Sequence, residues 1–240
     1  MCIRDSHHIA IIMDGNRRWA RERRFDVLKG HSQGSNTLKE IAEHAQKTGV
    51  DYLTVFAFST ENWRRPQREV NALIELMRRF LMQDLESLIS DNVRLRIIGD
   101  LAPFDRDLRA LFEDAVKQTS TNTGLQLTVA INYGGKQDLM QAMQKVASEN
   151  PDLKEISEDD LKSALQTSDL PEIDLLIRTG GEYRLSNFIL WDSAYAELYF
   201  SEKYWPDFTG ADLDEAIDNF ANRQRRFGGD VIEDVQSRKA

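Results

Sequence analysis

Short apolar runs alternate along this chain with stretches whose apolar residues recur at helical spacing. Several of the runs carry β-branched residues on consecutive positions, which is typical of strands buried on both faces of a sheet. The runs predict strands at 9–13, 52–58, 94–98, 125–131 and 175–177, with a weaker candidate at 188–190. No Pro/Gly/Ser-rich linker and no internal repeat interrupts the alternation.

The stretches between the runs predict helices at 37–47, 105–118 and 136–148, with a last one from about 212 to 225. Ser157 with Asp160 resembles a capping box that opens another helix. Between Leu73 and Leu88, apolar residues also fall on one helical face, which indicates core but also suits a pocket for an apolar substrate. The alternation predicts an α/β domain with a mostly parallel sheet flanked by helices.

Composition narrows the class of protein. The 240 residues are 41% hydrophobic and 30% charged, as expected of a soluble globular protein, and no apolar run approaches the roughly 18 residues that span a bilayer. Met1 to Ser6 lack the apolar core of a secretory signal. Cys2 is the only cysteine, which excludes an internal disulfide and a cysteine-based zinc site and favours the cytoplasm. The net charge of −9 argues against a general nucleic-acid binder.

The first apolar run ends on Asp14 and Gly15 and is followed by Asn16, Arg17 and Arg18. A strand feeding a tight turn places Asp14 at the strand's carboxyl end, where open α/β sheets bind ligands, and the next helix begins there with N–H groups that favour anions. A carboxylate there would repel phosphate unless a divalent metal bridged the two. The segment therefore indicates either a metal–diphosphate site or an aspartate that merely caps a helix.

Arginines cluster despite the acidic total. Five of the eight residues from Arg17 to Arg24 are arginine, although the Arg21–Arg24 portion is expected to face solvent. Arg178 follows a predicted strand and precedes Gly180 and Gly181, which suits a phosphate cradle as well as an ordinary turn with a surface arginine. Two further clusters complete the pattern: Arg64, Arg65 and Arg68, and Arg223, Arg225 and Arg226. The clusters favour a small polyanion over a long one.

Two other chemistries fit less well. The stretch from Gly30 to Gly34 matches the G-x-S-x-G nucleophile elbow, but no convincing strand precedes it and no suitable histidine follows. A helix start at which His31 meets an anion fits better. An aspartyl-phosphate at Asp14 would want a second aspartate two residues on, where the chain has Asn16.

Ordered motifs from about His8 to Gly229 closely resemble the cis-prenyltransferases, in particular the bacterial undecaprenyl diphosphate synthase type. The motifs are Met13-Asp14-Gly15-Asn16-Arg17-Arg18-Trp19, Gly30-His31, Phe58-Ser59-Thr60-Glu61-Asn62-Trp63-Arg64-Arg65-Pro66, Asn132-Tyr133-Gly134-Gly135, Ile177-Arg178-Thr179-Gly180-Gly181-Glu182, and Trp191 with Ala196-Glu197-Leu198-Tyr199-Phe200.

This resemblance implies a cytoplasmic, Mg²⁺-dependent homodimer that extends farnesyl diphosphate with isopentenyl diphosphate units, each new double bond being cis. The product would be a long undecaprenyl-type lipid carrier precursor; a shorter-chain synthase and a non-catalytic scaffold subunit are the alternatives. The implied fold is one domain at 8–229, with tails at 1–7 and 230–240, a six-stranded sheet and a hydrophobic tunnel. Contact with a membrane surface would accompany product release.

The resemblance also implies residue roles. Asp14 would hold Mg²⁺ and Glu197 would contribute to the metal site, while Asn62 would assist proton removal or orient the reactants. The allylic diphosphate would be held by Gly15, Asn16, Arg17, Arg18, Trp19 and His31. Isopentenyl diphosphate would be held by Arg178, Arg184, Leu185 and Ser186, with Arg226 and Gly228 reaching the partner subunit's diphosphate. The reacting end would be lined by Ser59, Thr60, Glu61, Trp63 and Arg65.

Two positions depart from the family pattern. The family usually has an arginine where this chain has Val27, which removes one expected diphosphate contact. It often has a histidine after Gly-Gly-Glu, where this chain has Tyr183, so a metal-binding role of that histidine is not available here. Asp14, Arg178 and Glu197 are all kept, and the chain is expected to be an active enzyme.

Overall fold

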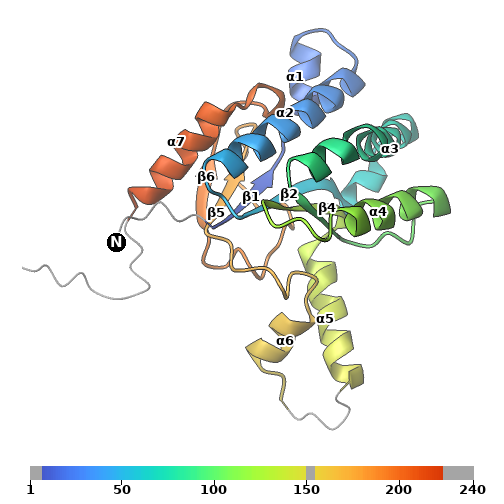
Figure 1. Ribbon diagram of the computed structural model, residues 1–240, viewed down its shortest axis with the longest axis vertical. Helices are drawn as coiled ribbons and strands as arrows, with labels where there is room; N and C mark the ends of the chain where they lie inside the picture. Colours follow the sequence, from blue (N-terminus) through green and yellow to red (C-terminus); the bar gives the residue numbers. More distant parts are fainter. Residues whose placement is uncertain (1–6, 150–154, 224–240) are drawn as a thin grey trace, which may run out of the picture.

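The computed structural model of the protein describes residues 7–149 and 155–223 (Figure 1). Within that part of the chain, six strands form one sheet in the order β3-β4-β2-β1-β5-β6, and every pairing is parallel. The strands are β1 (His8–Ile12), β2 (Tyr52–Ser59), β3 (Arg94–Ile98), β4 (Gln126–Tyr133), β5 (Leu175–Arg178) and β6 (Glu197–Phe200). The predicted α/β domain with a parallel sheet is confirmed.

Helices connect the strands; those predicted at 105–118 and 136–148 are found within one residue of these bounds, whereas the helix predicted at 37–47 begins earlier, at Val27. They are α1 (Asn16–Glu22), α2 (Val27–Lys47), α3 (Gln67–Ser90), α4 (Arg106–Gln118), α5 (Gly135–Glu149), α6 (Glu158–Ala164) and α7 (Gly210–Ala221), with 3₁₀ turns η1 (Thr60–Arg64) and η2 (Trp205–Asp207). The side chains of Asp26 and Asp105 cap α2 and α4, and Ser157 with Asp160 forms the predicted capping box of α6. These caps satisfy N–H groups that a helix start leaves unpaired.

One strand prediction is wrong. Residues 188–190 form no strand, and the sixth strand is β6 instead. The backbone has positive φ at Ser186, Asn187 and Ile189, which breaks any extended run there. Phe188 and Ile189 are nevertheless buried, because this turn folds under the sheet and the Phe188 ring stacks on Phe56 at 4.5 Å. Their apolar character reflects packing against the sheet and not membership of it.

Two apolar clusters cover the two faces of the sheet. The larger cluster packs side chains of α2, α3, α4 and α7 against one face, and the smaller packs the 185–189 turn against the other. Figure 1 shows α5 and α6 lying together and extending away from this body, and the two helices contact each other. Within residues 7–149 and 155–223, no helix is both long enough and apolar enough to cross a membrane.

The strand order places a topological switch point between β1 and β5. The connection that leaves β1 runs to β2 on one side, whereas the connection that leaves β5 runs to β6 on the other side. The loops that follow the two strands therefore diverge and open a crevice at the carboxyl end of the sheet. Asp14 follows β1 and Arg178 ends β5, so both stand at this crevice.

Candidate active site

Asp14 stands at the tip of the β1–α1 turn with its carboxylate turned toward the crevice. Its Oδ1 accepts a hydrogen bond from the Gly15 N–H at 2.7 Å. Gly15 is the N-cap residue of α1, has φ +107°, and makes no side-chain cap bond. A Cβ on Gly15 would come within 3 Å of Tyr204, so this sharp turn requires glycine. Asp14 does not act as the N-cap of α1, and its Oδ2 is left to face the arginines.

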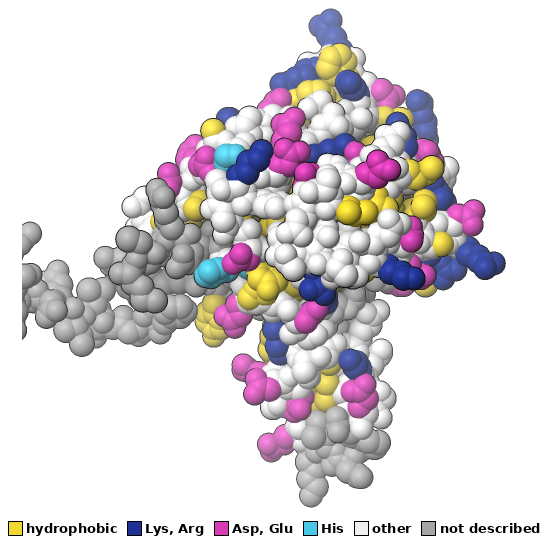
Figure 2. All heavy atoms as spheres, viewed as in Figure 1, with side chains coloured by type: hydrophobic (Ala, Val, Ile, Leu, Met, Phe, Trp, Pro, Cys, Tyr) yellow, Lys and Arg dark blue, Asp and Glu magenta, His cyan; other side chains and the backbone are white. Residues whose placement is uncertain are grey.

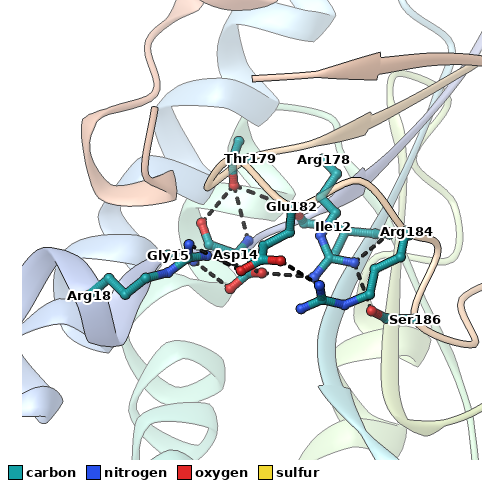
Figure 3. A network of polar contacts seen from close by, with 9 residues as sticks. All are labelled: Ile12, Asp14, Gly15, Arg18, Arg178, Thr179, Glu182, Arg184 and Ser186. Carbon is teal, nitrogen blue, oxygen red and sulfur yellow. Dashed lines mark hydrogen bonds and ion pairs between the residues drawn. The ribbon is translucent and has the colours of Figure 1, made fainter. Parts of the chain in front are cut away.

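Arg178 is buried, with only 3% of its surface exposed. Its guanidinium donates to Asp14 Oδ2 at 2.8 Å, to the Arg184 carbonyl at 2.5 Å and to Ser186 Oγ at 2.7 Å (Figure 3). Three acceptors on one fork hold the side chain in one orientation. Arg178 is therefore not a surface arginine beside an ordinary turn; it joins the β1 and β5 loops at the base of the crevice.

The Gly180–Gly181 turn brings a second layer of charge against Asp14. Gly180 has φ +88°, and a Cβ there would lie 2.7 Å from an Arg18 nitrogen. Arg18 lies 3.4 Å from Asp14 Oδ2 and 3.4 Å from Glu182 Oε1, and Arg184 also pairs with Glu182. The Thr179 hydroxyl donates to the Asp14 carbonyl at 2.8 Å and accepts from the Asp14 N–H at 3.0 Å. Figure 3 shows these side chains converging on Asp14.

Beside this network, Arg17, His31 and Arg65 surround the carboxylate of Glu69, the third residue of α3. His31 lies in the second turn of α2 and not at its start, because the helix already begins at Val27. The same helix contains the stretch from Gly30 to Gly34, which rules out a nucleophile elbow. Burial, and next the positive charge of Arg65, lower the pKa of His31 to about 4. The imidazole is therefore neutral at pH 7.

Most of these side chains line one cavity of about 320 Å³, which we term the polar cavity; those of Glu69, Arg178 and Thr179 are not part of its wall. Five arginines and two carboxylates contribute to its wall among the described residues. Asn16 Oδ1, Arg17 Nε and His31 Nε2 are buried and lack a hydrogen-bond partner in the described part of the chain. Buried polar atoms are normally paired, so these atoms indicate a bound polar group. The wall consists of Asp14, Gly15, Asn16, Arg17, Arg18, Arg21, His31, Arg65, Glu182 and Arg184.

The donor set of the polar cavity fits Mg²⁺ only together with a phosphate. Within the described ranges there is no group of three or more His, Cys, Asp or Glu side chains that could hold a metal ion alone. Asp14 offers a single carboxylate whose side chain is 32% exposed. Mg²⁺ commonly takes one or two protein carboxylates and completes its shell with water and substrate phosphates. Asp14 and a polyphosphate together would meet that requirement.

A second cavity, of about 120 Å³, adjoins the polar cavity and is lined mainly by apolar side chains. Asn16 and His31 belong to the walls of both cavities. Ala57 of β2 and the predicted apolar stripe on α3, from Leu73 to Leu81, supply much of this apolar cavity. The stripe thus serves as core and as cavity wall at once, so both interpretations of the sequence were partly right.

Several predicted site residues are not part of the wall of either cavity. Trp19 is buried on α1, where its indole N–H donates to Asp207 at 2.6 Å and its ring lies under Arg23. Trp63 donates to Asn132 at 2.8 Å and packs on Phe58. Asn62 Oδ1 accepts a hydrogen bond from the Ser59 N–H at 3.2 Å, and Thr60 lines a separate small cavity. Glu61 is exposed and accepts a hydrogen bond from Asn187, and Leu185 packs on the smaller apolar cluster.

The structure does not bring Glu197 to Asp14 within this chain. Glu197 opens β6 in register with Leu175, the first residue of β5, whereas Asp14 stands beyond the other end of the sheet. Its carboxylate accepts a hydrogen bond from Arg223 at 2.8 Å. Arg226 and Gly228 lie outside the described residues. Of the departures, Val27 is the first residue of α2, and Tyr183 is exposed and donates to Glu202.

Some contributors were not singled out from sequence. Thr179 and Glu182 stand in the recognised Arg-Thr-Gly-Gly-Glu stretch, so proximity to Arg178 was a usable signal. Arg21 lines the polar cavity although it is exposed, as predicted for the whole Arg21–Arg24 portion. Figure 2 shows this concentration of basic side chains over α1. Glu69 had no such signal, because Arg65 and Glu69 look like an ordinary surface pair at i,i+4.

The chain matches known proteins over most of its length. The family model described as "Putative undecaprenyl diphosphate synthase" matches residues 12–228. The isoprenyl transferase of Neisseria meningitidis serogroup A is 49% identical over 221 residues, covering 92% of this chain and 88% of that protein. The ditrans,polycis-undecaprenyl-diphosphate synthase ((2E,6E)-farnesyl-diphosphate specific) of Vibrio vulnificus strain YJ016 is 48% identical, covering 96% of this chain and 94% of that protein.

Two solved structures share the fold. The lavandulyl diphosphate synthase of Lavandula x intermedia, in complex with dimethylallyl diphosphate, superposes with a TM-score of 0.88 at 36% identity, covering 92% of this chain and 98% of that one. A probable undecaprenyl diphosphate synthase from Campylobacter jejuni gives 0.80 at 35% identity, covering 93% and 99%. With a switch-point crevice that holds an arginine-lined cavity, and with these matches over nearly all of its length, the chain belongs to the undecaprenyl diphosphate synthase family of prenyltransferases.

Proposed function

We propose that this protein condenses isopentenyl diphosphate units onto farnesyl diphosphate, with cis double bonds, to make a long undecaprenyl-type polyprenyl diphosphate. The observation that carries the proposal is that the arginine-lined polar cavity and the apolar cavity share Asn16 and His31. An allylic diphosphate has one strongly anionic end and one apolar tail. A ligand that crosses the shared wall would place each end in a matching environment.

In this proposal the allylic diphosphate lies in the polar cavity against α1. Gly15, Asn16, Arg17 and Arg18 line the wall at the start of the helix, where free N–H groups and the helix dipole favour an anion. His31 of α2 and Arg65, the residue after η1, complete the wall of the cavity. The unpaired Arg17 Nε and His31 Nε2 supply donors for phosphate oxygens, provided that the neutral His31 carries its proton on Nε2.

The isopentenyl diphosphate would lie near Arg178, Arg184 and Ser186. Both terminal nitrogens of Arg178 already donate hydrogen bonds, to Asp14, Arg184 and Ser186. The role of Arg178 is therefore to hold the loop that carries Arg184 and Ser186. Arg184 is mostly exposed and can turn its guanidinium to a phosphate. The two diphosphates would then lie on either side of Asp14, which keeps the reacting carbons close together.

Asp14 would hold Mg²⁺ on a diphosphate, where the metal supplies charge neutralisation of the leaving group. The arginines of the polar cavity act in the same direction, since negative charge grows on the diphosphate as its bond to the allylic carbon breaks. The apolar wall excludes water from the cationic carbon. The Asn62 oxygen is held by the Ser59 N–H and an amide is a weak base, so Asn62 orients the reactants while a diphosphate oxygen accepts the proton.

The growing chain would extend along α3. Leu38 and Phe80 line the apolar cavity and also a further small cavity between α2 and α3, which is bounded by Leu88, Val93 and Leu127. We propose that these spaces form the product tunnel when a chain separates Leu38 from Phe80. The small side chain of Ala57 leaves room in the apolar cavity, which favours a long product over a short one.

The proposal includes a homodimer. Glu197 is separated from the end of β5 by three residues along the paired strand, about 10 Å at the usual strand rise. It could therefore contribute to a metal site only in a second copy of the chain, and Arg226 and Gly228 are proposed to act across the same interface. The domain is proposed to span 8–229 and to work in the cytoplasm, with a membrane surface receiving the product.

The test is an incubation of the purified protein with farnesyl diphosphate, labelled isopentenyl diphosphate and Mg²⁺, with and without a chelator, followed by sizing of the extracted lipid. The expected result is a chelator-sensitive ladder that ends in a long polyprenyl product. A ladder that stops after a few additions would favour the shorter-chain synthase. No incorporation by a folded dimer would favour the non-catalytic subunit and would direct attention to Val27 and Tyr183.

A further inference from the structure

Glu69 is a buried acid that lies against Arg17, His31 and Arg65, three residues of the polar cavity wall, although Glu69 itself is not part of that wall. It is 8% exposed and lies in the first turn of α3. Its Oε1 is 3.1 Å from Arg65 Nη1, 3.5 Å from His31 Nε2 and 3.6 Å from Arg17 Nε. By charge alone, a carboxylate at this place weakens the attraction of the cavity for a diphosphate. The contribution of Glu69 to the cavity must therefore outweigh this weakening.

The three contacts differ in kind. Only the Arg65 contact is a hydrogen bond, because the Arg17 and His31 distances exceed the usual range. Arg17 Nε and His31 Nε2 lie near the carboxylate but have no hydrogen-bond partner among the described residues. Arg17 and Arg65 also repel each other, and burial together with that repulsion lowers the pKa of Arg65, while Glu69 opposes the effect. Glu69 thus holds two like charges and an imidazole together; it accepts a hydrogen bond from Arg65 Nη1 but leaves Arg17 Nε and His31 Nε2 unpaired.

Glu69 belongs to the helix that lines the apolar cavity and contacts residues that line the polar cavity. Further along α3, Leu73, Leu76 and Met77 form part of the wall of the apolar cavity. Arg17, His31 and Arg65 come from α1, α2 and the residue after η1. A single buried carboxylate therefore brings the first turn of α3 into contact with residues of three separate elements that line the polar cavity.

We propose that Glu69 is a positioning residue that holds Arg17, His31 and Arg65 in the arrangement that binds the allylic diphosphate. The proposal rests on the proposed function, since it requires that the polar cavity holds a diphosphate. It makes a prediction opposite in sign to simple electrostatics. If Glu69 acted only through its charge, its neutralisation would tighten diphosphate binding. If it positions the cations, neutralisation weakens binding.

The test is Glu69→Gln, which keeps the size of the side chain and removes its charge. Binding of inorganic pyrophosphate is measured by calorimetry, and KM is measured separately for farnesyl diphosphate and isopentenyl diphosphate. Loss of a residue that orients the ligands of a metal site typically costs about 10-fold to 100-fold in affinity or activity, and we take the low end of this range for a residue that orients diphosphate-binding groups. We expect the pyrophosphate Kd and the farnesyl diphosphate KM to rise about 10-fold, and the isopentenyl diphosphate KM to change less than twofold. Unchanged or tighter pyrophosphate binding overturns the proposal.

Glu75→Gln is the matched control, because it makes the same chemical change at an exposed position of the same helix. It is expected to leave all three constants at the wild-type values. Arg65→Met and the double variant Arg65→Met/Glu69→Gln complete a cycle. If Glu69 acts through Arg65, the double variant loses less than the sum of the single losses, and full additivity overturns the proposal. If Glu69→Gln does not fold, Glu69→Asp, which keeps the charge, takes its place. It is expected to raise the KM for farnesyl diphosphate selectively, and equal effects on the KM of both substrates overturn the proposal.

The outcomes for the two proposals are distinguishable. Failure of the wild-type protein to bind pyrophosphate would refute the proposed diphosphate cavity itself. Normal wild-type binding with an equally strong Glu69→Gln variant would refute only the role of Glu69.

Discussion

Asp14→Ala tests the central assignment of the proposed function. The substitution removes the Oδ1 bond to the Gly15 N–H at 2.7 Å and the Oδ2 contacts to Arg178 at 2.8 Å and Arg18 at 3.4 Å. Arg178 is buried, but it keeps its bonds to the Arg184 carbonyl and Ser186 Oγ. The guanidinium is therefore not left without partners. The Asp14 side chain is 32% exposed, so water can replace part of what is lost.

The effects on folding and on turnover should differ widely. Losing these charge-assisted bonds at a partly exposed position costs about 1–3 kcal/mol, which is small beside a typical unfolding free energy of about 5–15 kcal/mol. The protein should remain folded, with Tm lower by roughly 2–4 °C for each kcal/mol. A metal ion commonly supplies several kcal/mol of transition-state stabilisation, and about 4 kcal/mol corresponds to about a 10³-fold loss of rate.

The assay compares the Mg²⁺-dependent rate of isopentenyl diphosphate incorporation with a thermal melt of the same samples. Asp26→Ala is the control, because Asp26 is an exposed N-cap of α2 whose loss costs about 0.5–2 kcal/mol of stability. It should melt earlier, like Asp14→Ala, but keep its activity. An Asp14→Ala protein with a Mg²⁺-dependent rate within tenfold of wild type would refute the metal role of Asp14.

Three further predictions concern single side chains. Arg178→Lys cannot reach its three acceptors with one ammonium group and should lower kcat/KM for isopentenyl diphosphate about 10²-fold; retention of wild-type kinetics would contradict the arrangement. Ala57→Leu adds bulk to the apolar cavity of about 120 Å³ and should shorten the products, so an unchanged ladder would count against the tunnel. The pKa of His31 falls from 6.5 to about 4 on folding, so the unfolded chain takes up its proton first; the stability that this shift contributes is present above pH 6.5 and is lost as pH falls toward 4. The free energy of unfolding, measured with denaturant, should fall between pH 7.5 and pH 5 by about 2 kcal/mol less in His31→Gln than in wild type. An equal fall in both proteins would show that the pKa of His31 is not lowered.

The candidate site was partly predictable because its residues follow strand ends. Asp14 and Arg178 stand directly after apolar runs, and parallel strands deliver such residues to one edge of the sheet. Glu69 was not predictable, because its spacing from Arg65 is that of a common surface pair, and Arg17 and His31 are distant in sequence. Trp19 carries the expected motif, yet its indole N–H faces Asp207. A motif identifies a residue but does not say which way its side chain points.

The sequence by itself determined most of the local structure, since apolar periodicity and the Ser157 capping box specify strands and helices through interactions between near neighbours, although the start of α2 at Val27 was missed. It also sufficed for family membership, because the motifs are ordered and long. Only the tertiary structure decided that β6 and not the apolar turn at 188–190 joins the sheet, because burial on a sheet face and membership of the sheet demand the same apolar residues. It likewise decided the grouping of charges around Glu69, because Coulomb interactions depend on distance in space, which only the folded chain defines.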